Sequence, residues 1–356
     1  MHTRSDIYVQ QDLPEKQVWD YICEYFPNHI YSDRKFFKWQ HGLGDHLGCR
    51  DSSLLGVTQS GDISGFLSCW VIGYQSEKTK LIEAAQSSNI IVTASDPSIY
   101  PSLMNRLHQH SVVLASNMTP RASIAQIRFG YQHTELRRFF FFFRKPQFIK
   151  NFPAALVSQP VNREIGEHVI DVQSGVVNKS NYKNIFLTLD NERLGYTLPA
   201  FKWRYVDHPY FTYKYVEFSC ESRKLIFIYR VQRIGEIELF LRISSISGAL
   251  ELLALAMKRF QDLCYEQKIC FADFSTNHSF LQDALSRAGW LPDVLNRAIK
   301  IPLKFAPLQS TEFTTYPFAI RTKIGTLGLT DFNLSVADVD CDRPTPFGLK
   351  NELYLP

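Results

Sequence analysis

The chain has 356 residues, which is enough for two domains of ordinary size and an appendage. Its composition, 45% hydrophobic and 21% charged, is that of a soluble globular protein, and its net charge of +4 argues against DNA as a partner. No apolar run is long enough to span a membrane, and seven scattered cysteines indicate the reduced thiols of a cytoplasmic protein.

The first half is expected to alternate helices with strands. Apolar groups spaced by three and four predict a helix over 15–27, and Phe36 begins a second short helix. A Gly/Asp/Ser turn at 59–62 predicts a hairpin, and Gly130 suits a left-handed cap at the end of a helix. The other expected elements are strands at 53–58, 64–72, 89–94 and 111–116 and helices at 98–109 and 120–128.

A run of five phenylalanines, Phe139–Phe143, closes this half between two pairs of basic residues. Alternate residues of a strand point to opposite faces, so the run cannot have one apolar and one polar face. It therefore predicts a strand that is covered on both faces.

The second half is expected to repeat this order of elements. Turn residues at 232–235 predict a hairpin, and 249–265 has the composition of a long helix. Prolines at 146, 153 and 160 mark the connection between the halves. The expected elements are strands at 224–231, 235–243, 271–275 and 296–303 and helices at 249–265 and 278–288.

Three landmarks occur twice, in one order and at nearly one spacing. Phe37-Lys38-Trp39 returns as Phe201-Lys202-Trp203, and each copy is followed by a Ser/Thr-Asn pair and then by a Gly-aromatic pair. The repetition predicts a tandem duplication of a unit of roughly 150 residues. We expect domains at 1–150 and 151–308 and a tail at 309–356, with both tryptophans as core anchors of helices.

The order of elements in each half resembles that of the GNAT acyltransferases. The residues that carry the resemblance are Ser116-Asn117 with Phe129-Gly130-Tyr131, and Thr276-Asn277 with Ala288-Gly289-Trp290. They look like the family's late signature, in which an asparagine starts a helix that a Gly-aromatic pair ends. The resemblance implies an α/β (α+β) fold of two tandem GNAT-like domains, each a mixed central sheet flanked by helices.

Tandem GNAT architecture resembles two groups of enzymes. One is the FemABX-like aminoacyl transferases, and the other is a set of proteins of bacterial surface-polysaccharide synthesis that N-acylate amino sugars. The ending Asp338-Val339-Asp340-Cys341-Asp342-Arg343-Pro344 looks like that of the second group. This likeness implies an N-acyltransferase that moves an acyl group, most simply acetyl from acetyl-CoA, to a nucleotide-linked amino sugar in a cleft between the halves. A tRNA-dependent aminoacyl transferase and a non-catalytic binding protein remain the alternatives.

The loop that holds the coenzyme A pyrophosphate in ordinary members of the family is altered in both halves. Small residues let phosphate reach backbone N–H groups at a helix N-terminus, but residues 95–102 have no glycine and include Asp96 and Pro97. The second half is therefore the expected donor half. Its candidate donor-binding residues are Ser244, Ser245, Ser247, Gly248 and Asn277, as a modest anion nest, although a helix cap is the favoured interpretation of Ser247.

Several residues are candidates for acid–base chemistry or acceptor binding. Glu236 and Glu238 share one face of a predicted strand, where either is a possible general base or a solvent-facing residue. His41, His46 and His208 follow the two Phe-Lys-Trp segments, where His208 is a possible base and His41 and His46 are possible acceptor-binding residues; ordinary loop histidines are the other interpretation of all three. Asp340 is a further catalytic candidate, and the further candidates for acceptor binding are Tyr205, Tyr210, Asp338, Asp342 and Arg343.

The three aspartates of the tail alternate with Val339 and Cys341. In an extended segment Asp338, Asp340 and Asp342 point to one side, where they suit a substrate ammonium; a solvated acidic turn neutralised by Arg343 is the other interpretation. The segment lacks the glycine and the distal glutamate of a calcium loop. We expect no metal.

Overall fold

The structure is a computed structural model, and contacts divide it into two compact units that each draw on separate stretches of the chain. Unit 1 comprises Met1–Thr134, Leu194–Pro209 and Pro317–Asp331, and unit 2 comprises Glu135–Arg193, Tyr210–Tyr316 and Phe332–Pro356. Domain boundaries at 150 and 308 remain a prediction about the duplication. The described residues are 6–9, 14–25, 27, 30–41, 48–76, 81–92, 98–116, 120–147, 152–158, 170–189, 193–234, 238–292 and 316–335.

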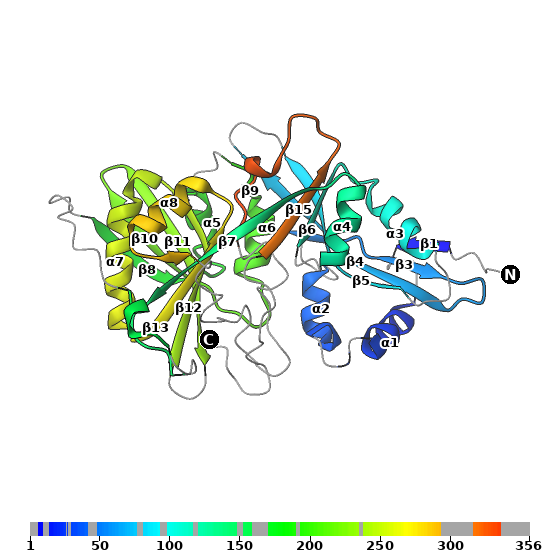
Figure 1. The fold of residues 1–356 in the computed structure, drawn as a ribbon, viewed down its shortest axis with the longest axis horizontal. Coiled ribbons are helices and arrows are strands. Elements are labelled where there is room, and N and C mark those ends of the chain that lie inside the picture. The colour runs from blue at the N-terminus through cyan, green and yellow to red at the C-terminus, as the bar shows by residue number, and fades with distance from the viewer. Residues whose placement is uncertain are drawn as a thin grey trace. The chain divides into compact units, whose positions relative to one another are not determined.

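Unit 1 is built on a mixed sheet with the strand order β1-β3-β4-β5-β6-β15, to which β2 and β9 add by pairing with β4 (Figure 1). All of these neighbours are antiparallel except β5 and β6, which are parallel. The strands are β1 (Asp6–Val9), β2 (Cys49–Asp51), β3 (Leu54–Val57), β4 (Ile63–Gln75), β5 (Ile82–Val92), β6 (Val112–Ser116), β9 (Gly195–Tyr196) and β15 (Tyr316–Thr322).

Helices cover both faces of this sheet. α3 packs Ile99 and Leu103 against Leu67 and Val113 in one apolar cluster. η2 lies on the other face, where Tyr31 bonds Ser68 of β4. The helical elements of unit 1 are α1 (Glu15–Tyr25), η2 (Ile30–Ser32), α2 (Arg34–Gln40), α3 (Ile99–Leu107), α4 (Pro120–Arg128), α6 (Leu198–Tyr205) and η6 (Leu329–Asp331).

Unit 2 has a second mixed sheet, with the order β8-β10-β11-β12-β13-β7, and β14 pairs with β7. Only β12 and β13 are parallel among these neighbours. Its strands are β7 (Gln132–Phe142), β8 (Asp171–Val176), β10 (Lys214–Cys220), β11 (Arg223–Ile234), β12 (Glu238–Gly248), β13 (Ile269–Thr276) and β14 (Leu291–Pro292). Its helices are η3 (Ala154–Leu156), α5 (Tyr182–Leu187), η4 (Leu250–Leu252), α7 (Leu253–Glu266) and α8 (Ser279–Arg287).

The predicted α/β class and its internal repetition are confirmed. The series β3, β4, β5, α3, β6, α4, β7 recurs as β10, β11, β12, α7, β13, α8, β14, with the same parallel pair in each series. Gly130 and Gly289 end the matching helices α4 and α8 with positive φ angles of 79° and 81°, as the predicted left-handed cap requires. β10 was not expected, although Val216 and Phe218 alternate with Glu217 as in a half-buried strand.

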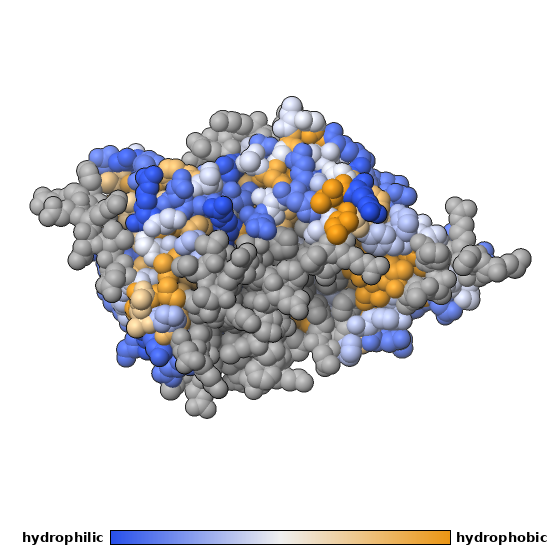
Figure 2. All heavy atoms as spheres, viewed as in Figure 1, coloured by the Kyte–Doolittle hydropathy of each residue, from blue (hydrophilic) through white to orange (hydrophobic). Residues whose placement is uncertain are grey.

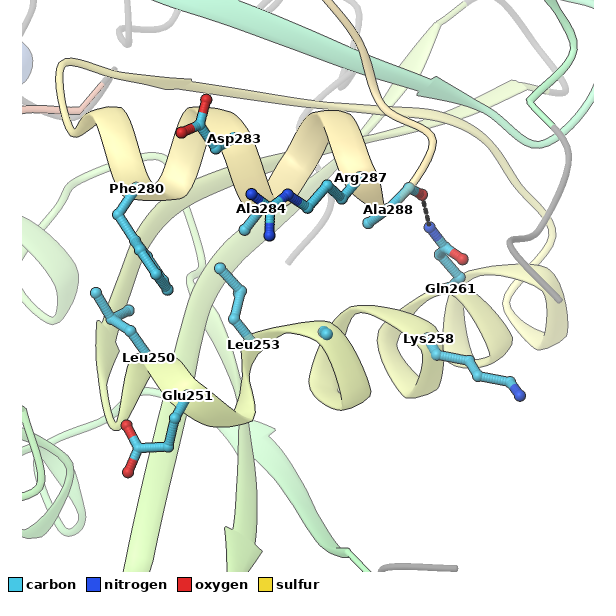
Figure 3. A pocket seen from close by; sticks show the side chains of 11 residues that line it. Leu250, Glu251, Leu253, Lys258, Gln261, Phe280, Asp283, Ala284, Arg287 and Ala288 are labelled. Carbon is cyan, nitrogen blue, oxygen red and sulfur yellow. Dashed lines mark hydrogen bonds between the residues drawn. The ribbon is translucent and has the colours of Figure 1, made fainter. Parts of the chain in front are cut away.

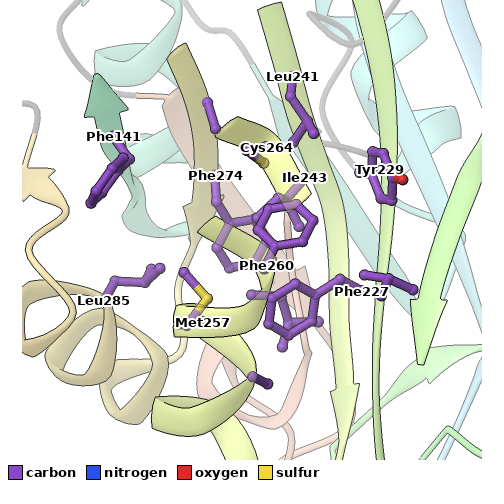
Figure 4. Close-up of a cluster of buried hydrophobic side chains, with 14 of the residues drawn as sticks. Phe141, Phe227, Tyr229, Leu241, Ile243, Met257, Phe260, Cys264, Phe274 and Leu285 are labelled. Atoms are coloured by element: carbon purple, nitrogen blue, oxygen red, sulfur yellow. The ribbon is translucent and has the colours of Figure 1, made fainter. Parts of the chain in front are cut away.

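The five phenylalanines are buried on both faces of β7, as predicted. Phe139, Phe141 and Phe143 belong to the large core under α7 and α8, which Figure 4 shows around Phe260. Phe140 and Phe142 belong to a separate cluster on the other face. Burying each ring stabilises the fold by roughly 1.5–3 kcal/mol relative to exposure, so this strand is a main anchor of unit 2.

The two Phe-Lys-Trp segments meet within unit 1. The rings of Trp39 on α2 and Trp203 on α6 stack at 4.8 Å with an interplanar angle of 14°. Each indole Nε1–H donates to the backbone carbonyl of the other tryptophan, at 3.0 and 2.8 Å. Trp39 and Trp203 are each 3% exposed, which confirms them as core anchors.

Some large apolar side chains of the described residues are exposed at the surface. Figure 2 shows one such spot over α4, where Ile124 and Ile127 are 58% and 60% exposed. None of the helices in the described part of the chain has the length and apolarity to cross a membrane.

Candidate functional site

The parallel pair β12 and β13 of unit 2 parts at a defined point. Their pairing runs from Leu239↔Ile269 to Ile243↔Phe274 and goes no further. At the same point the pairing of β12 with β11 shifts register, because Ile243 faces Tyr229 and Ser245 already faces Ile228. Ser244 is the extra residue of this β-bulge, which bends the strand and leaves one residue outside the ladder.

A short piece of the chain lies in this divergence. We call Phe332–Ser335 the inserted segment. Ser335 forms an antiparallel bridge with Thr276 of β13, and its hydroxyl donates to the carbonyl of Ser244 on β12 at 2.5 Å. The segment therefore connects the two strands where they no longer pair with each other.

Asn277 holds the inserted segment in place. Its side-chain amide donates to the Phe332 carbonyl and accepts from the Leu334 N–H, both at 3.0 Å, while its backbone N–H donates to the Leu334 carbonyl at 3.4 Å. The asparagine expected at a donor site is thus occupied with main-chain groups of the protein.

Unit 1 contains the same divergence. The parallel pairing of β5 with β6 ends at Ser87↔Ala115. Beside it, the register of β4 against β5 shifts between Leu67 and Cys69, whose partners are Ile90 and Ser87. Ser88 and Asn89 of β5 thus face the single residue Ser68 of β4, so the extra residue of this bulge lies in β5.

A hydrogen-bonded network of buried polar groups leads to this bulge in unit 1. His41 Nδ1 lies 3.2 Å from Asp51 Oδ1 and 2.9 Å from Ser53 Oγ, and His41 Nε2 lies 3.3 Å from Ser68 Oγ. The Tyr31 hydroxyl lies 3.2 Å from Ser68 Oγ.

The same tyrosine connects the network to the strand. The Tyr31 hydroxyl lies 2.7 Å from Ser88 Oγ and accepts from Gln40 Nε2 at 3.3 Å. His41 and Ser68 are completely buried, whereas Ser88 is half-buried. The network therefore runs from the core of unit 1 to a residue at the divergence.

Unit 2 has charged groups at the corresponding place. Arg242 donates through Nε and Nη2 to the two carboxylate oxygens of Asp273, at 2.9 and 2.7 Å, and Arg138 Nε donates to Asp273 Oδ2 at 2.8 Å. All three side chains are buried. Burial alone raises the pKa of Asp273, but the two guanidinium groups outweigh it and hold this pKa below its ordinary value.

The predicted anion nest does not form as a loop before the helix. Ser244, Ser245, Ser247 and Gly248 all lie within β12, which pairs with β11 through Gly248. Gly248 is required for packing, because a Cβ atom there would lie 2.3 Å from the Lys224 carbonyl oxygen. The expectation that Ser247 caps the helix is also wrong, since η4 and α7 begin at Leu250 and Leu253.

Glu238 is the first residue of β12, at the end remote from the divergence. Six positions of strand, roughly 20 Å, separate it from Ser244 at the bulge. Its carboxylate accepts from the Gln147 N–H at 2.7 Å and lies 3.6 Å from the Cys270 sulfur. Burial and this carboxylate raise the pKa of the Cys270 thiol to about 12. The structure does not bring Glu238 to the bulge.

The remaining described candidates also lie in packed surroundings. His208 is 7% exposed and packs against the rings of Phe36 and Trp39 in unit 1. Tyr205 is buried against Phe201, and Tyr210 is half-buried in the connection to β10. Those outside the described residues are Glu236, His46, Asp338, Asp340, Asp342 and Arg343, as is the expected strand at 296–303.

A groove of about 290 Å³ lies between α7 and α8 (Figure 3). Leu250 and Phe280 face each other near the starts of the helices, and Gln261 Nε2 donates to the Ala288 carbonyl at the other end. Lys258 and Arg287 add positive charge to its rim. Among the described residues, no three His, Cys, Asp or Glu side chains are grouped to hold a metal ion.

Sequence reasoning missed the partners of His41 and the whole arginine–aspartate cluster. A signal for the cluster was present: Asp273 follows Cys270-Phe271-Ala272, and Arg242 follows Leu239-Phe240-Leu241, so each charge sits inside an apolar run. A charge inside a buried strand requires an opposite charge beside it. No comparable signal pointed to Ser68 or Ser88.

No family model matches the chain, and no curated protein matches it. Solved structures with a similar trace include Saccharomyces cerevisiae N-myristoyltransferase with bound myristoyl-CoA, at 10% identity and a TM-score of 0.48, over 94% of this chain and 82% of that one. Eis1 from Mycobacterium abscessus matches at 13% identity and a TM-score of 0.43, over 76% of this chain and 64% of that one. A GCN5-related N-acetyltransferase from Anabaena variabilis matches at 12% identity and a TM-score of 0.49, over 90% of this chain and 73% of that one.

Proposed function

We propose that this protein is an N-acyltransferase that moves an acyl group from acyl-CoA to an amine at the divergence of β5 and β6 in unit 1. The observation that carries the proposal is the inserted segment of unit 2. There, the divergence of two parallel strands accepts an amide-bearing piece of chain, which is bonded to both strands. The pantetheine arm of coenzyme A is likewise an extended chain with two amide groups.

We choose unit 1 because the inserted segment fills the divergence of unit 2. In unit 2 a donor must first displace Phe332–Ser335, which Asn277 holds by three hydrogen bonds. Unit 1 has the same parting strands and the same kind of bulge. A bulge leaves backbone groups outside the ladder, and such groups suit the tetrahedral oxyanion of acyl transfer.

The acceptor that we propose is the amino group of a nucleotide-linked sugar, in a cytoplasmic step of bacterial surface-polysaccharide synthesis. This part rests on the resemblance of the chain's ending to that group of GNAT proteins. In this proposal Asp338, Asp340 and Asp342 attract the ammonium and Arg343 the diphosphate. FemABX-like transfer from a charged tRNA is the alternative for the donor, because no glycine-rich loop precedes α3.

Titration calorimetry with acetyl-CoA tests the donor and its place. Ser88 in unit 1 and Ser245 in unit 2 are both half-buried serines beside the bulges, so they form a matched pair. Ser88→Val narrows the unit 1 divergence, and we expect it to weaken acetyl-CoA binding at least about tenfold, or roughly 1.4 kcal/mol. Ser245→Val is expected to leave the affinity unchanged.

Two results would overturn the proposal. A larger loss in Ser245→Val than in Ser88→Val would move the donor to unit 2. If wild-type protein binds no acetyl-CoA but transfers an amino acid from a charged tRNA, the donor is aminoacyl-tRNA and not acyl-CoA.

A further inference from the structure

Within the buried network of unit 1, a series of hydrogen-bonded groups leads from a carboxylate to the divergence. We propose that the path Asp51–His41–Ser68–Tyr31–Ser88 is a proton relay that deprotonates the acceptor ammonium. This inference rests on the proposed function, since it assigns the acid–base chemistry of the same site. It gives a role to His41 other than substrate binding.

The partners of His41 determine which ring nitrogen carries the proton. The Ser53 hydroxyl donates to the Cys69 carbonyl at 3.1 Å, so toward the histidine it only accepts. Asp51 Oδ1, the other neighbour of His41 Nδ1, is also an acceptor. Nδ1 is therefore the protonated nitrogen, and Nε2 presents a lone pair to Ser68.

The direction of the other hydrogen bonds follows from this lone pair. Ser68 donates its only hydroxyl hydrogen to His41 Nε2, and it accepts from the Tyr31 hydroxyl. Tyr31 then accepts from Ser88. Each group donates toward the histidine, and hydrogen bonds aligned in this way strengthen one another.

The proton balance of the relay is simple. The ammonium gives one proton to Ser88 Oγ while Ser88, Tyr31 and Ser68 each pass their own hydrogen inward, and His41 Nε2 takes the last one. The neutral amine then has the lone pair that attacks the thioester. As the C–N bond forms and the C–S bond breaks, the second proton of the nitrogen passes to the departing thiolate, so coenzyme A leaves as the thiol, and His41 afterwards returns its proton to solvent along the same path. The imidazolium is stabilised by the carboxylate of Asp51 at 3.2 Å.

The surroundings of His41 favour it as the end of the relay. The rings of Phe37, Tyr31 and Trp70 lie around the imidazole with centroids 4.3–5.9 Å away, and Asp51 is the charged group that contacts it. The nearby thiols do not compete, because burial raises the pKa of both Cys49 and Cys69. Arg50, the nearest exposed cation in sequence on β2, pairs with Glu83.

The burial of Ser68 excludes a second interpretation of these residues. Ser68, His41 and Asp51 have the order of a hydroxyl–imidazole–carboxylate triad, in which the serine is a nucleophile. Ser68, however, has no exposed surface, so it cannot meet a thioester. Ser88 is the only member of the path that is exposed in part.

Nitrogen-15 NMR of the histidine ring tests the path without any assay. We expect wild-type His41 to carry its proton on Nδ1, and we expect Tyr31→Phe to shift the Nε2 resonance because Ser68 loses its donor. Tyr131→Phe is the matched control, since it removes the hydroxyl from another Tyr–His pair of unit 1, with His108 at 3.1 Å. A His41 protonated on Nε2 would contradict the relay.

The pH dependence of acyl transfer tests the role. Below the pKa of the acceptor amine, Tyr31→Phe is expected to lower kcat/KM by about 100-fold, as loss of general-base catalysis does. The loss should shrink as pH rises to the amine pKa, because free amine no longer needs the relay. Ser88→Ala, at a partly exposed position, repeats the test if Tyr31→Phe fails to fold.

The outcomes separate this inference from the proposed function. Equal pH profiles for wild type, Tyr31→Phe and Ser88→Ala would overturn the relay and leave the acyltransferase standing. Wild-type protein without acyl transfer to any amine would overturn the proposed function and, with it, the role of the path.

Discussion

The two units have the same parting of parallel strands and differ in the groups beside it. In unit 2 the next-to-last residue pair of the two parallel strands is Arg242 with Asp273. In unit 1 the corresponding pair is Gln86 with Leu114. Unit 2 thus has fixed charges beside a divergence that its own chain fills. Unit 1 has neutral hydroxyls that lead to a histidine. The two series of elements have the same backbone arrangement, and the polar side chains beside the diverging strands distinguish them.

The largest effect is expected from breaking the charge cluster of unit 2. Asp273→Asn leaves two buried guanidinium groups without their carboxylate, and loss of one partner in a buried cluster costs about 3–5 kcal/mol. Urea unfolding measures this change. Asp262→Asn on α7, where the pair with Arg259 is exposed, is the control and should change stability by less than about 0.5 kcal/mol. Equal stability of the two variants would contradict a structural role for the cluster.

An intermediate effect is expected from releasing the inserted segment. Asn277→Ala removes two side-chain hydrogen bonds to Phe332 and Leu334, at a cost of about 1–3 kcal/mol. Hydrogen exchange at residues 332–335 should become faster, which would make the unit 2 divergence more like an open one. Asn178→Ala, an exposed asparagine that bonds its own loop, should leave this exchange unchanged. Slow exchange in Asn277→Ala would mean that other contacts hold the segment.

Much of the architecture was predictable because it depends on local patterns. The Phe139–Phe143 strand, the helices around Trp39 and Trp203 and the glycine caps follow from periodicity and backbone sterics. The pairing of the two tryptophans was not predictable, since 164 residues separate them and no local signal specifies the partner.

The site was less predictable, for two physical reasons. A bulge shifts register by one residue without any required residue type, so Ser244 and Ser88 look like ordinary strand residues in the sequence. The glycine at 248 suggested a phosphate loop, but it serves a close approach to the Lys224 carbonyl. A glycine in a sequence indicates that the backbone needs its small size or its conformational freedom, but it does not indicate whether a phosphate or another part of the chain approaches there.

The smallest effect concerns how acid acts on the two units. Burial, with Arg321 and Lys323 nearby, lowers the pKa of His108 in unit 1 to about 4, against 6.5 in the unfolded chain. The unfolded state therefore takes up the proton first, and unit 1 loses stability as pH falls from about 6.5 to about 4. The pKa values of His110 and His133 are lowered by burial in the same direction. In unit 2 the stabilisation from ionised Asp273 persists until the pH falls below 3.8, its ordinary pKa, because its folded pKa is lower still.

Acid should consequently weaken unit 1 before unit 2, which hydrogen exchange resolved by residue can measure between pH 7 and pH 3. His108→Gln keeps an acceptor for the Tyr131 hydroxyl but cannot titrate, so it should flatten the decline of unit 1. Because His108 is only half-buried, solvent screening reduces the expected gain to on the order of 1 kcal/mol at pH 4. If the stability of unit 1 declines equally in His108→Gln, then His110 and His133 cause the acid sensitivity of unit 1. If unit 2 opens at a higher pH than unit 1, then the Asp273 cluster, despite its two arginines, is the weaker part of the protein in acid.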